Sequence, residues 1–343
     1  MKLFSLFTQD LAVDLGTANT LIIEDGKVVI DEPSIVAIDR KTGETIAVGN
    51  KAMQMHEKTH ENIKTIRPLK DGVIADFQAA EALIQGLINM IGTKRRFFTH
   101  LKMVICIPSG ITEVEKRAVF DSADHVDSKE TYLIHEPMAA ALGIGLDVQE
   151  PVGNMIIDIG GGTTEIAVIA MSGIVNDQSI RTAGDEFTND IIDYMRRYHN
   201  LLIGERTAEQ IKIHVGSALK TLDDPPEPFA MNGRDLMTGI PKQINIRYEE
   251  TAEALDASIG KIEEAVIKAL EATPPELSSD IFRTGLYLTG GGALLRGLDK
   301  RIAQKVKLDV HVAEDPLRAV VRGTGIALKN TDRFSFLIDR KSI

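Results

Sequence analysis

The stretch that most constrains the fold is a glycine-rich turn near the middle of the chain. Residues 155–165 read Met-Ile-Ile-Asp-Ile-Gly-Gly-Gly-Thr-Thr-Glu, a β-branched run that ends in an acid before three glycines. Glycine tolerates positive φ and lets another backbone approach closely, so the run predicts a buried strand followed by a tight turn. Apolar residues resume at Ile166 and Val168. We therefore predict a strand-turn-strand unit, unlike the strand-to-helix turn of a dinucleotide fold.

This turn has the chemistry of a phosphate-binding loop. Its glycines expose consecutive backbone N–H groups to an anion, and Thr163 and Thr164 add hydroxyl donors. Asp158, at the end of the strand, is placed to hold a hydrated magnesium ion. No Gly-x-x-x-x-Gly-Lys-Ser/Thr stretch occurs in the sequence, which excludes a P-loop.

The same pattern occurs near the start of the chain. Residues 11–20 read Leu-Ala-Val-Asp-Leu-Gly-Thr-Ala-Asn-Thr, which indicates an internal duplication. A third apolar run followed by glycines occurs in residues 286–294, where Gly290, Gly291 and Gly292 form a turn suited to the flat face of a base or ribose. Two facing Asp-Gly-Thr turns and this third turn predict a nucleotide clamp between two related lobes.

Composition restricts the class of protein. A length of 343 residues with 43% hydrophobic residues predicts about two soluble domains. The net charge of −11 argues against broad nucleic-acid binding. Cys106 is the single cysteine and lies in an apolar run, so we expect a buried, inert thiol and no disulfide framework. No apolar run reaches the roughly 18 residues needed to span a bilayer, and we expect a cytoplasmic protein.

Three charged side chains stand out among the expected helices. Glu136 follows an apolar strand and precedes Pro137, so it lies at a strand-helix junction facing whatever the turns hold. A carboxylate there favours a general base or water-orienting residue over a structural cap. Glu209 and Lys212 lie three apart on a helix that Thr207 is expected to cap, and their spacing alone predicts an ordinary solvated ion pair.

A basic and aromatic segment breaks the usual pattern of a loop. Lys94, Arg95, Arg96, Phe97 and Phe98 follow one another between an expected helix and strand. Either the two rings fold back into the core, or they form a membrane-inserting tip flanked by cations that attract anionic lipid. A single copy would bind weakly, so such a tip is effective when many copies are linked. The apolar cluster in residues 1–9 is equally open to packing on the domain or to anchoring in a membrane.

Five segments together resemble one known family. They are Asp14–Thr20, Arg67–Phe77, Glu136–Ala141, Asp158–Glu165 and Leu288–Leu295, and their order is similar to that of the MreB bacterial actins. Single motifs are shared with sugar kinases and heat-shock chaperone ATPases, but the Arg67–Phe77 stretch and the order of all five are more specific. The resemblance covers nearly the whole chain.

The resemblance implies an α/β, actin-like fold with two duplicated, ribonuclease H-like lobes. Each lobe would carry a smaller insertion subdomain, with the nucleotide in the central cleft. The implied boundaries are 1–31, 76–142 and 313–343 for subdomain IA, 32–75 for IB, 143–183 and 251–312 for IIA, and 184–250 for IIB.

The resemblance also implies a role for each site residue. The phosphates of ATP would contact Thr17, Ala18, Asn19, Gly160, Gly161, Gly162, Thr163 and Thr164. The adenosine would be surrounded by Gly184, Glu209, Gln210, Ile211, Lys212, Gly290, Gly291, Gly292, Ala293 and Leu294. Asp14 and Asp158 would hold Mg²⁺ through water, and Glu136 and Thr163 would be the catalytic residues that position the attacking water.

The function implied by the resemblance is structural. Such a protein forms double protofilaments on the inner face of the plasma membrane, organises cell-wall synthesis with the elongation machinery, and so determines rod shape. Slow ATP hydrolysis would time polymer turnover, and Phe97 and Phe98 would lie in the family's membrane loop. A small-molecule kinase would need a second carboxylate motif for its substrate, and a chaperone would need a substrate-binding region after Gly325; the sequence has neither.

Overall fold

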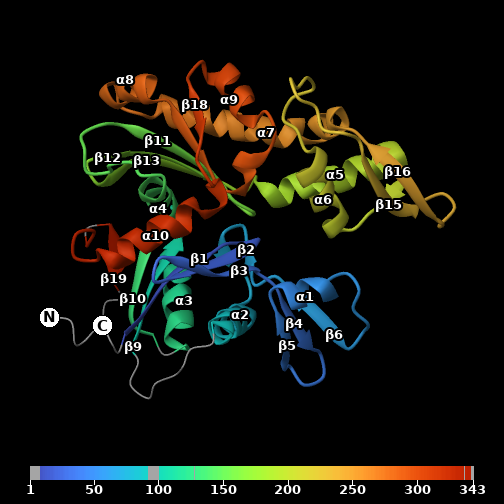
Figure 1. Ribbon diagram of the computed structural model, residues 1–343, viewed down its shortest axis with the longest axis horizontal. Helices are drawn as coiled ribbons and strands as arrows, with labels where there is room; N and C mark the ends of the chain where they lie inside the picture. The colour runs from blue at the N-terminus through green and yellow to red at the C-terminus, as the bar shows by residue number, and fades with distance from the viewer. Residues whose placement is uncertain (1–7, 92–99, 127, 336, 341–343) are drawn as a thin grey trace.

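The computed structural model describes residues 8–91, 100–126, 128–335 and 337–340. Two large sheets lie one above the other in Figure 1, with helices α4 (Glu136–Gly143) and α10 (Ala319–Lys329) between them. A small sheet extends from the same side of each large one (Figure 1). The strand-turn-strand prediction around Asp158 is confirmed, because β11 (Asn154–Ile159) pairs antiparallel with β12 (Thr164–Ala170).

The two large sheets share one topology. The first has the order β19-β10-β9-β1-β2-β3, and the second has the order β13-β12-β11-β17-β18. In each, an antiparallel three-strand meander begins at the aspartate-bearing strand, which pairs in parallel with a later strand on its other side. The parallel neighbour then pairs in parallel with one more strand. The sheets therefore confirm the internal duplication predicted from the repeated Asp-Gly-Thr pattern.

The strands of the first sheet are β1 (Thr8–Leu15), β2 (Asn19–Glu24), β3 (Lys27–Pro33), β9 (His100–Ile107), β10 (Ser128–His135) and β19 (Ile338–Arg340). Those of the second are β11, β12, β13 (Gly173–Ile180), β17 (Leu286–Thr289) and β18 (Val310–Val312). β11 and β12 are buried along their whole length, as their continuous apolar runs require.

The smaller sheets are separate from the large ones. β4 (Val36–Asp39), β5 (Thr45–Val48) and β6 (Ile63–Ile66) form one with helix α1 (Asn50–Met55), and β14 (Leu201–Leu202), β15 (Phe229–Asp235) and β16 (Pro241–Ile246) form another. A short hairpin, β7 (Leu69–Lys70) and β8 (Val73–Ile74), returns the chain from the first of these. The arrangement agrees with four subdomains, and the exact boundaries given above stay a prediction.

The remaining helices are α2 (Phe77–Met90), α3 (Glu113–Asp124), α5 (Gly184–His199), α6 (Glu205–Val215), α7 (Tyr248–Glu271), α8 (Pro275–Thr284) and α9 (Leu298–Val306), with 3₁₀ turns η2 (Gly291–Leu294) and η3 (Pro316–Arg318). Of these, α5 and α6 lie with the second small sheet, where they contact β14 and β15, and the others pack against the large sheets. Asp76 caps α2, and Thr112 and Glu115 form the capping box of α3. The last helix returns to the first lobe, because α10 packs on α4, β1 and β9.

The apolar core is divided between the lobes. One cluster fills the second lobe around β11, β12 and α7, and another lies between α2, α3 and the first sheet. A third joins the two lobes around α4 and α10, where Ala12 of β1 and Ile156 of β11 belong to the same cluster. Within the described ranges, no helix has the length and apolar character that crossing a membrane requires.

Candidate functional site

The two Asp-Gly-Thr turns meet at their tips. A β-carbon at Gly161 would lie 2.7 Å from the β-carbon of Ala18, and one at Gly162 would lie 2.7 Å from the hydroxyl of Thr17. Both glycines are thus required by close approach of the other lobe. The Thr17 hydroxyl also accepts a hydrogen bond of 3.0 Å from the backbone N–H of Gly72, which belongs to the β7–β8 hairpin. The structure brings together the two turns that the sequence predicted to face each other.

Each turn is led by a carboxylate that carries one hydrogen bond from a neighbouring strand. Asp14 Oδ1 accepts from the Cys106 thiol at 3.1 Å, and Asp158 Oδ1 accepts from the Thr289 hydroxyl at 2.8 Å. Burial raises the pKa of Asp14 to about 6 and that of Asp158 to about 7. Cys106 is buried, as expected, and burial together with the Asp14 charge raises the pKa of its thiol.

Glu136 occupies the predicted junction, as the first residue of α4 directly after β10. Burial, followed by the charges of Glu165, Asp14 and Asp158, raises the pKa of its carboxyl well above the ordinary value. Glu165 was not assigned a role from the sequence. Its carboxylate accepts hydrogen bonds from the Ser179 hydroxyl at 2.6 Å and from the backbone N–H of Ser109 at 3.2 Å.

These carboxylates fit a hydrated magnesium ion. Within the described part of the chain, the charged groups that raise the pKa values of Glu136 and Asp158 are all acids, so a bound cation would offset their buried negative charge. Hard carboxylate oxygens are the donors that Mg²⁺ prefers. Among the described residues, no three His, Cys, Asp or Glu side chains are grouped to hold an ion directly. That Asp14 and Asp158 hold Mg²⁺ through water stays a prediction.

Two of the predicted adenosine residues, Gly184 and Lys212, lie against the glycine turn of the second lobe. The N–H groups of Gly184 and Asp185 donate to the carbonyls of Gly160 and Gly161 at 3.1 and 2.7 Å. Lys212 Nζ donates to the Gly184 carbonyl at 2.7 Å. These contacts tie α5 and α6 to the phosphate turn.

Lys212 and Glu209 are more than the solvated pair that their spacing predicts. Lys212 Nζ lies 2.7 Å from Glu209 Oε2 and 3.0 Å from the Thr188 hydroxyl, and its side chain is 15% exposed. Thr188 in turn donates to Glu209 at 2.9 Å. The pair belongs to a fixed network, which the sequence could not reveal because Thr188 lies on another helix. The backbone carbonyl of Gln210 accepts a hydrogen bond from the His214 ring, and Ile211 is buried in the core of the lobe.

The third glycine turn packs against the strand that carries Asp158. At Gly290, where φ is +77°, a β-carbon would lie 2.8 Å from Asp158 Oδ1, and Gly292 faces the side chain of Ile159. Gly291, Gly292, Ala293 and Leu294 form η2. Leu294 is 54% exposed, and Leu317, whose side chain lies 3.1 Å from a β-carbon built on Gly291, is 50% exposed. Leu317 thus lies beside the turn that was predicted to face the base, a position that its sequence neighbours do not indicate.

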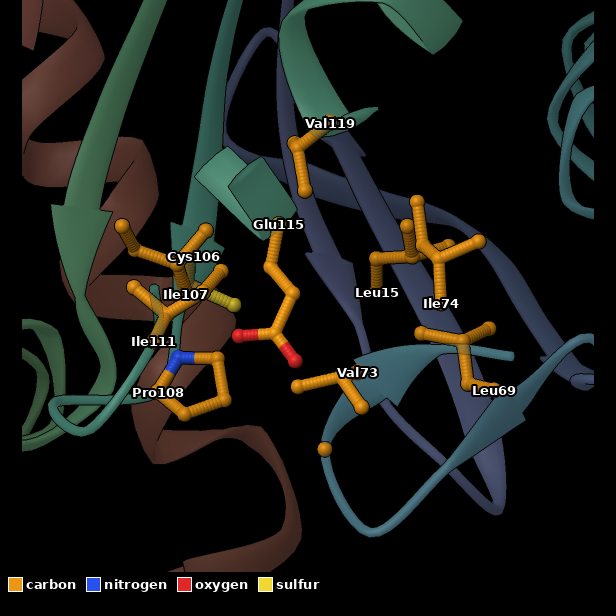
Figure 2. Close-up of a pocket in the computed structure, with 11 residues that line it drawn as sticks. Leu15, Leu69, Val73, Ile74, Cys106, Ile107, Pro108, Ile111, Glu115 and Val119 are labelled. Atoms are coloured by element: carbon orange, nitrogen blue, oxygen red, sulfur yellow. The ribbon is translucent and has the colours of Figure 1, made fainter. Parts of the chain in front are cut away.

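A small cavity lies beneath the first turn (Figure 2). Its volume is about 10 Å³, and it is lined mainly by apolar side chains with the Glu115 carboxylate among them (Figure 2). Leu15 and Cys106, which flank Asp14, form part of its wall (Figure 2). A space of this size holds about one water molecule. It is too small for a nucleotide.

The expected membrane residues cannot be placed. Lys94, Arg95, Arg96, Phe97 and Phe98 lie outside the described residues, as do residues 1–7. The membrane tip therefore stays a prediction.

A comparison with known protein families settles which family this is. The family model described as MreB/Mbl protein matches residues 8–335. The chain belongs to the MreB/Mbl family. It is 47% identical over 329 residues to cell shape-determining protein Mbl of Bacillus subtilis (strain 168), covering 96% of this chain and 98% of Mbl. It is 46% identical over 336 residues to cell shape-determining protein MreB of Escherichia coli (strain K12), covering 96% of both.

Solved structures of similar proteins share the architecture. The crystal structure of MreB5 of Spiroplasma citri bound to ADP has a TM-score of 0.89 and 38% identity, and covers 95% of this chain and 98% of that one. MreB5 has also been solved bound to AMPPNP, with a TM-score of 0.88. The MamK double helical filament has a TM-score of 0.78 at 22% identity, and covers 95% of this chain and 99% of that one. The fold is therefore actin-like, and the expected fold class is confirmed.

Proposed function

We propose that this MreB/Mbl chain is an ATP-dependent, actin-like filament protein that determines cell shape from the inner face of the plasma membrane. The observation that carries this is the meeting of the two duplicated Asp-Gly-Thr turns at Gly161 and Ala18. Relatives that match almost the full chain are named as cell shape-determining proteins. A relative at 38% identity has been solved bound to ADP and to AMPPNP.

The site residues divide into three tasks. The backbone N–H groups of both turns, with Thr17 and Thr163, bind the phosphates. The fixed Glu209–Lys212 network and η2 bind the adenosine. Asp14 and Asp158 hold Mg²⁺ through water, and that ion supplies charge neutralisation for the phosphates.

Glu136 carries the chemistry of hydrolysis together with Thr163. Its raised pKa, caused by burial and by neighbouring acids, makes the carboxylate a better proton acceptor than an exposed glutamate. Glu136 orients the attacking water and accepts its proton, and Thr163 fixes the position of that water. Burial of this carboxylate among like charges suits slow hydrolysis that times polymer turnover.

Assembly and membrane attachment complete the proposal. Each protomer is divided into the four subdomains given above, and the protomers polymerise into double protofilaments. Many copies of Phe97, Phe98 and the adjacent cations hold the filament on lipid. The filament then organises the cell-wall elongation machinery.

Sedimentation tests this function. The full chain should pellet when Mg·ATP is added and should float with vesicles containing anionic lipid. The Asp158→Asn variant, which lacks one proposed Mg²⁺ residue, should stay in the supernatant at the same concentration. Equal pelleting without nucleotide would contradict a nucleotide-gated polymer.

A further inference from the structure

The most specific motif of the sequence, Arg67–Phe77, begins with an arginine that the nucleotide site does not use. Arg67 directly follows β6 of the small sheet of the first lobe. Its guanidinium Nη2 donates to Glu205 Oε1, at the first residue of α6 in the second lobe. The two residues lie on opposite insertions, so this ion pair joins the lobes.

A second side chain from the first lobe reaches the same carboxylate. His56 Nε2 lies 3.2 Å from Glu205 Oε2, so both oxygens of Glu205 are occupied from the other lobe. The other ring nitrogen of His56 lies 2.9 Å from the hydroxyl of Thr65 on β6, which fixes the orientation of the ring. Two contacts to one carboxylate define its position far better than a single surface pair.

In a third contact, the second lobe supplies the donor and the first lobe supplies the carboxylate. The backbone N–H of Glu205 donates to Glu57 Oε1 at 3.0 Å. This N–H is at the start of α6, where the helix dipole favours a negative charge. Glu57 has φ of +59°, a left-handed conformation that is unusual for a glutamate. At the N-cap, Gly204 leaves room for the approach, because a β-carbon there would overlap the Glu57 carboxylate.

The resulting cluster, which we call the clasp, consists of His56, Glu57, Arg67, Gly204 and Glu205. The side chains of His56, Arg67 and Glu205 are only 22%, 24% and 33% exposed, so solvent screens their contacts less than a typical surface pair. By comparison, the interlobe pair Arg181–Asp71 spans 3.9 Å, and Arg181 is 72% exposed.

The clasp holds the helix that carries part of the proposed adenosine site. Glu205 is the first residue of α6, and Lys212 on the same helix donates to the Gly184 carbonyl beside the phosphate turn. Release of the insertion from Glu205 would free the start of α6 from the first lobe. A nucleotide held between the lobes would then have a wider path out.

We propose that the clasp is a latch that closes the two insertions over the bound nucleotide, and that its opening sets the rate of nucleotide release. The inference rests on the proposed nucleotide site. It assigns Arg67, His56, Glu57 and Glu205 to exchange and not to phosphate contact or hydrolysis.

Stopped-flow dissociation of a fluorescent ADP analogue tests the latch in the full-length protein. The Glu205→Gln variant should release the analogue about tenfold faster than the unmodified protein. The reason is that loss of one charge-assisted hydrogen bond changes a rate by about a factor of ten. His56→Ala should also accelerate release. The control is Glu253→Gln, which removes another ion pair of the second lobe, to Lys220 at 3.6 Å, and should leave the rate unchanged.

A double-mutant cycle separates the latch from a general loss of structure. Arg67→Gln and Glu205→Gln should each accelerate release, and the double variant should be no faster than the faster single variant, because both changes break one contact. Unchanged release in Glu205→Gln, or fully additive effects in the double variant, would overturn the latch. Failure of the unmodified protein to bind the analogue would instead contradict the proposed function.

Discussion

Gly143 on α4 and Gly323 on α10 face each other at the junction of the two lobes. A β-carbon on Gly143 would overlap the carbonyl of Ala319, and one on Gly323 would overlap the carbonyl of Ala139. The two helices therefore pack backbone against backbone, between the large sheets (Figure 1). This contact sets how closely α10 packs on α4 in the layer between the two sheets.

We expect Gly323→Ala to destabilise the protein. The added methyl must push α10 away from α4, and overpacking of this kind costs about 1–3 kcal/mol in the free energy of unfolding. The matched control is Gly260→Ala on α7, where nothing lies within 4 Å of the new carbon. That change should stabilise the helix by up to about 1 kcal/mol. Urea unfolding measures both, and equal stability of the two variants would refute the close packing.

Replacement of Glu136 by alanine should slow ATP turnover while nucleotide affinity stays near normal. Loss of a general base costs about 10²–10⁴-fold in rate. Glu136→Gln, which keeps the shape but accepts a proton poorly, should be slowed similarly. Phosphate release and nucleotide titration measure the two quantities, and normal turnover in either variant would remove the assigned role.

The buried carboxyl of Asp158 predicts a pH dependence of stability without nucleotide or Mg²⁺. Its pKa is raised from 3.8 to about 7 in the folded protein, mainly by burial. Between these values the folded state holds a proton that the unfolded state has lost. The contribution of Asp158 to the free energy of unfolding should therefore be complete below about pH 4. It should fall as the pH rises to about 7, by at most about 1.4 kcal/mol per pH unit.

The Asp158→Asn variant isolates this effect, because its amide does not titrate. Urea unfolding in EDTA at pH 5 and pH 7.5 should show a smaller loss of stability in the variant than in the unmodified protein. The same loss in both would show that Asp158 is not the group responsible.

Replacement of Phe97 and Phe98 by serine should abolish binding to anionic vesicles. Each ring contributes about 1.5–3 kcal/mol on burial, so the loss should exceed what the neighbouring cations supply. ATP-driven pelleting without lipid is the control and should be unchanged. If the variant still floats with vesicles, residues 1–9 or another surface must hold the membrane.

Local sequence patterns predicted the strands and turns around the candidate site. The run from Met155 to Glu165 predicts a strand-turn-strand unit because glycines and β-branched residues leave few other conformations. The repeat at Asp14 predicts the duplicated topology, and the structure confirms it. Glu136 was placed correctly because Pro137 fixes the start of its helix.

Contacts between distant segments could not be predicted from the sequence. The expected cap at Thr207 is wrong: α6 begins at Glu205, with Gly204 at the N-cap and the Glu57 carboxylate accepting from the first N–H. The residue that binds this N–H lies in the other lobe, where local spacing carries no information. The sequence predicted only a solvated ion pair at Glu209 and Lys212, because their partner Thr188 lies on another helix.

A crystal structure with Mg·AMPPNP would show directly whether the two turns bind one triphosphate. We expect one triphosphate in contact with the backbone N–H groups of both turns, at Thr17–Ala18 and Gly161–Gly162. It also predicts a Mg²⁺ ion whose water ligands reach Asp14 and Asp158. A nucleotide bound elsewhere, or phosphates that touch only one of the two turns, would contradict it.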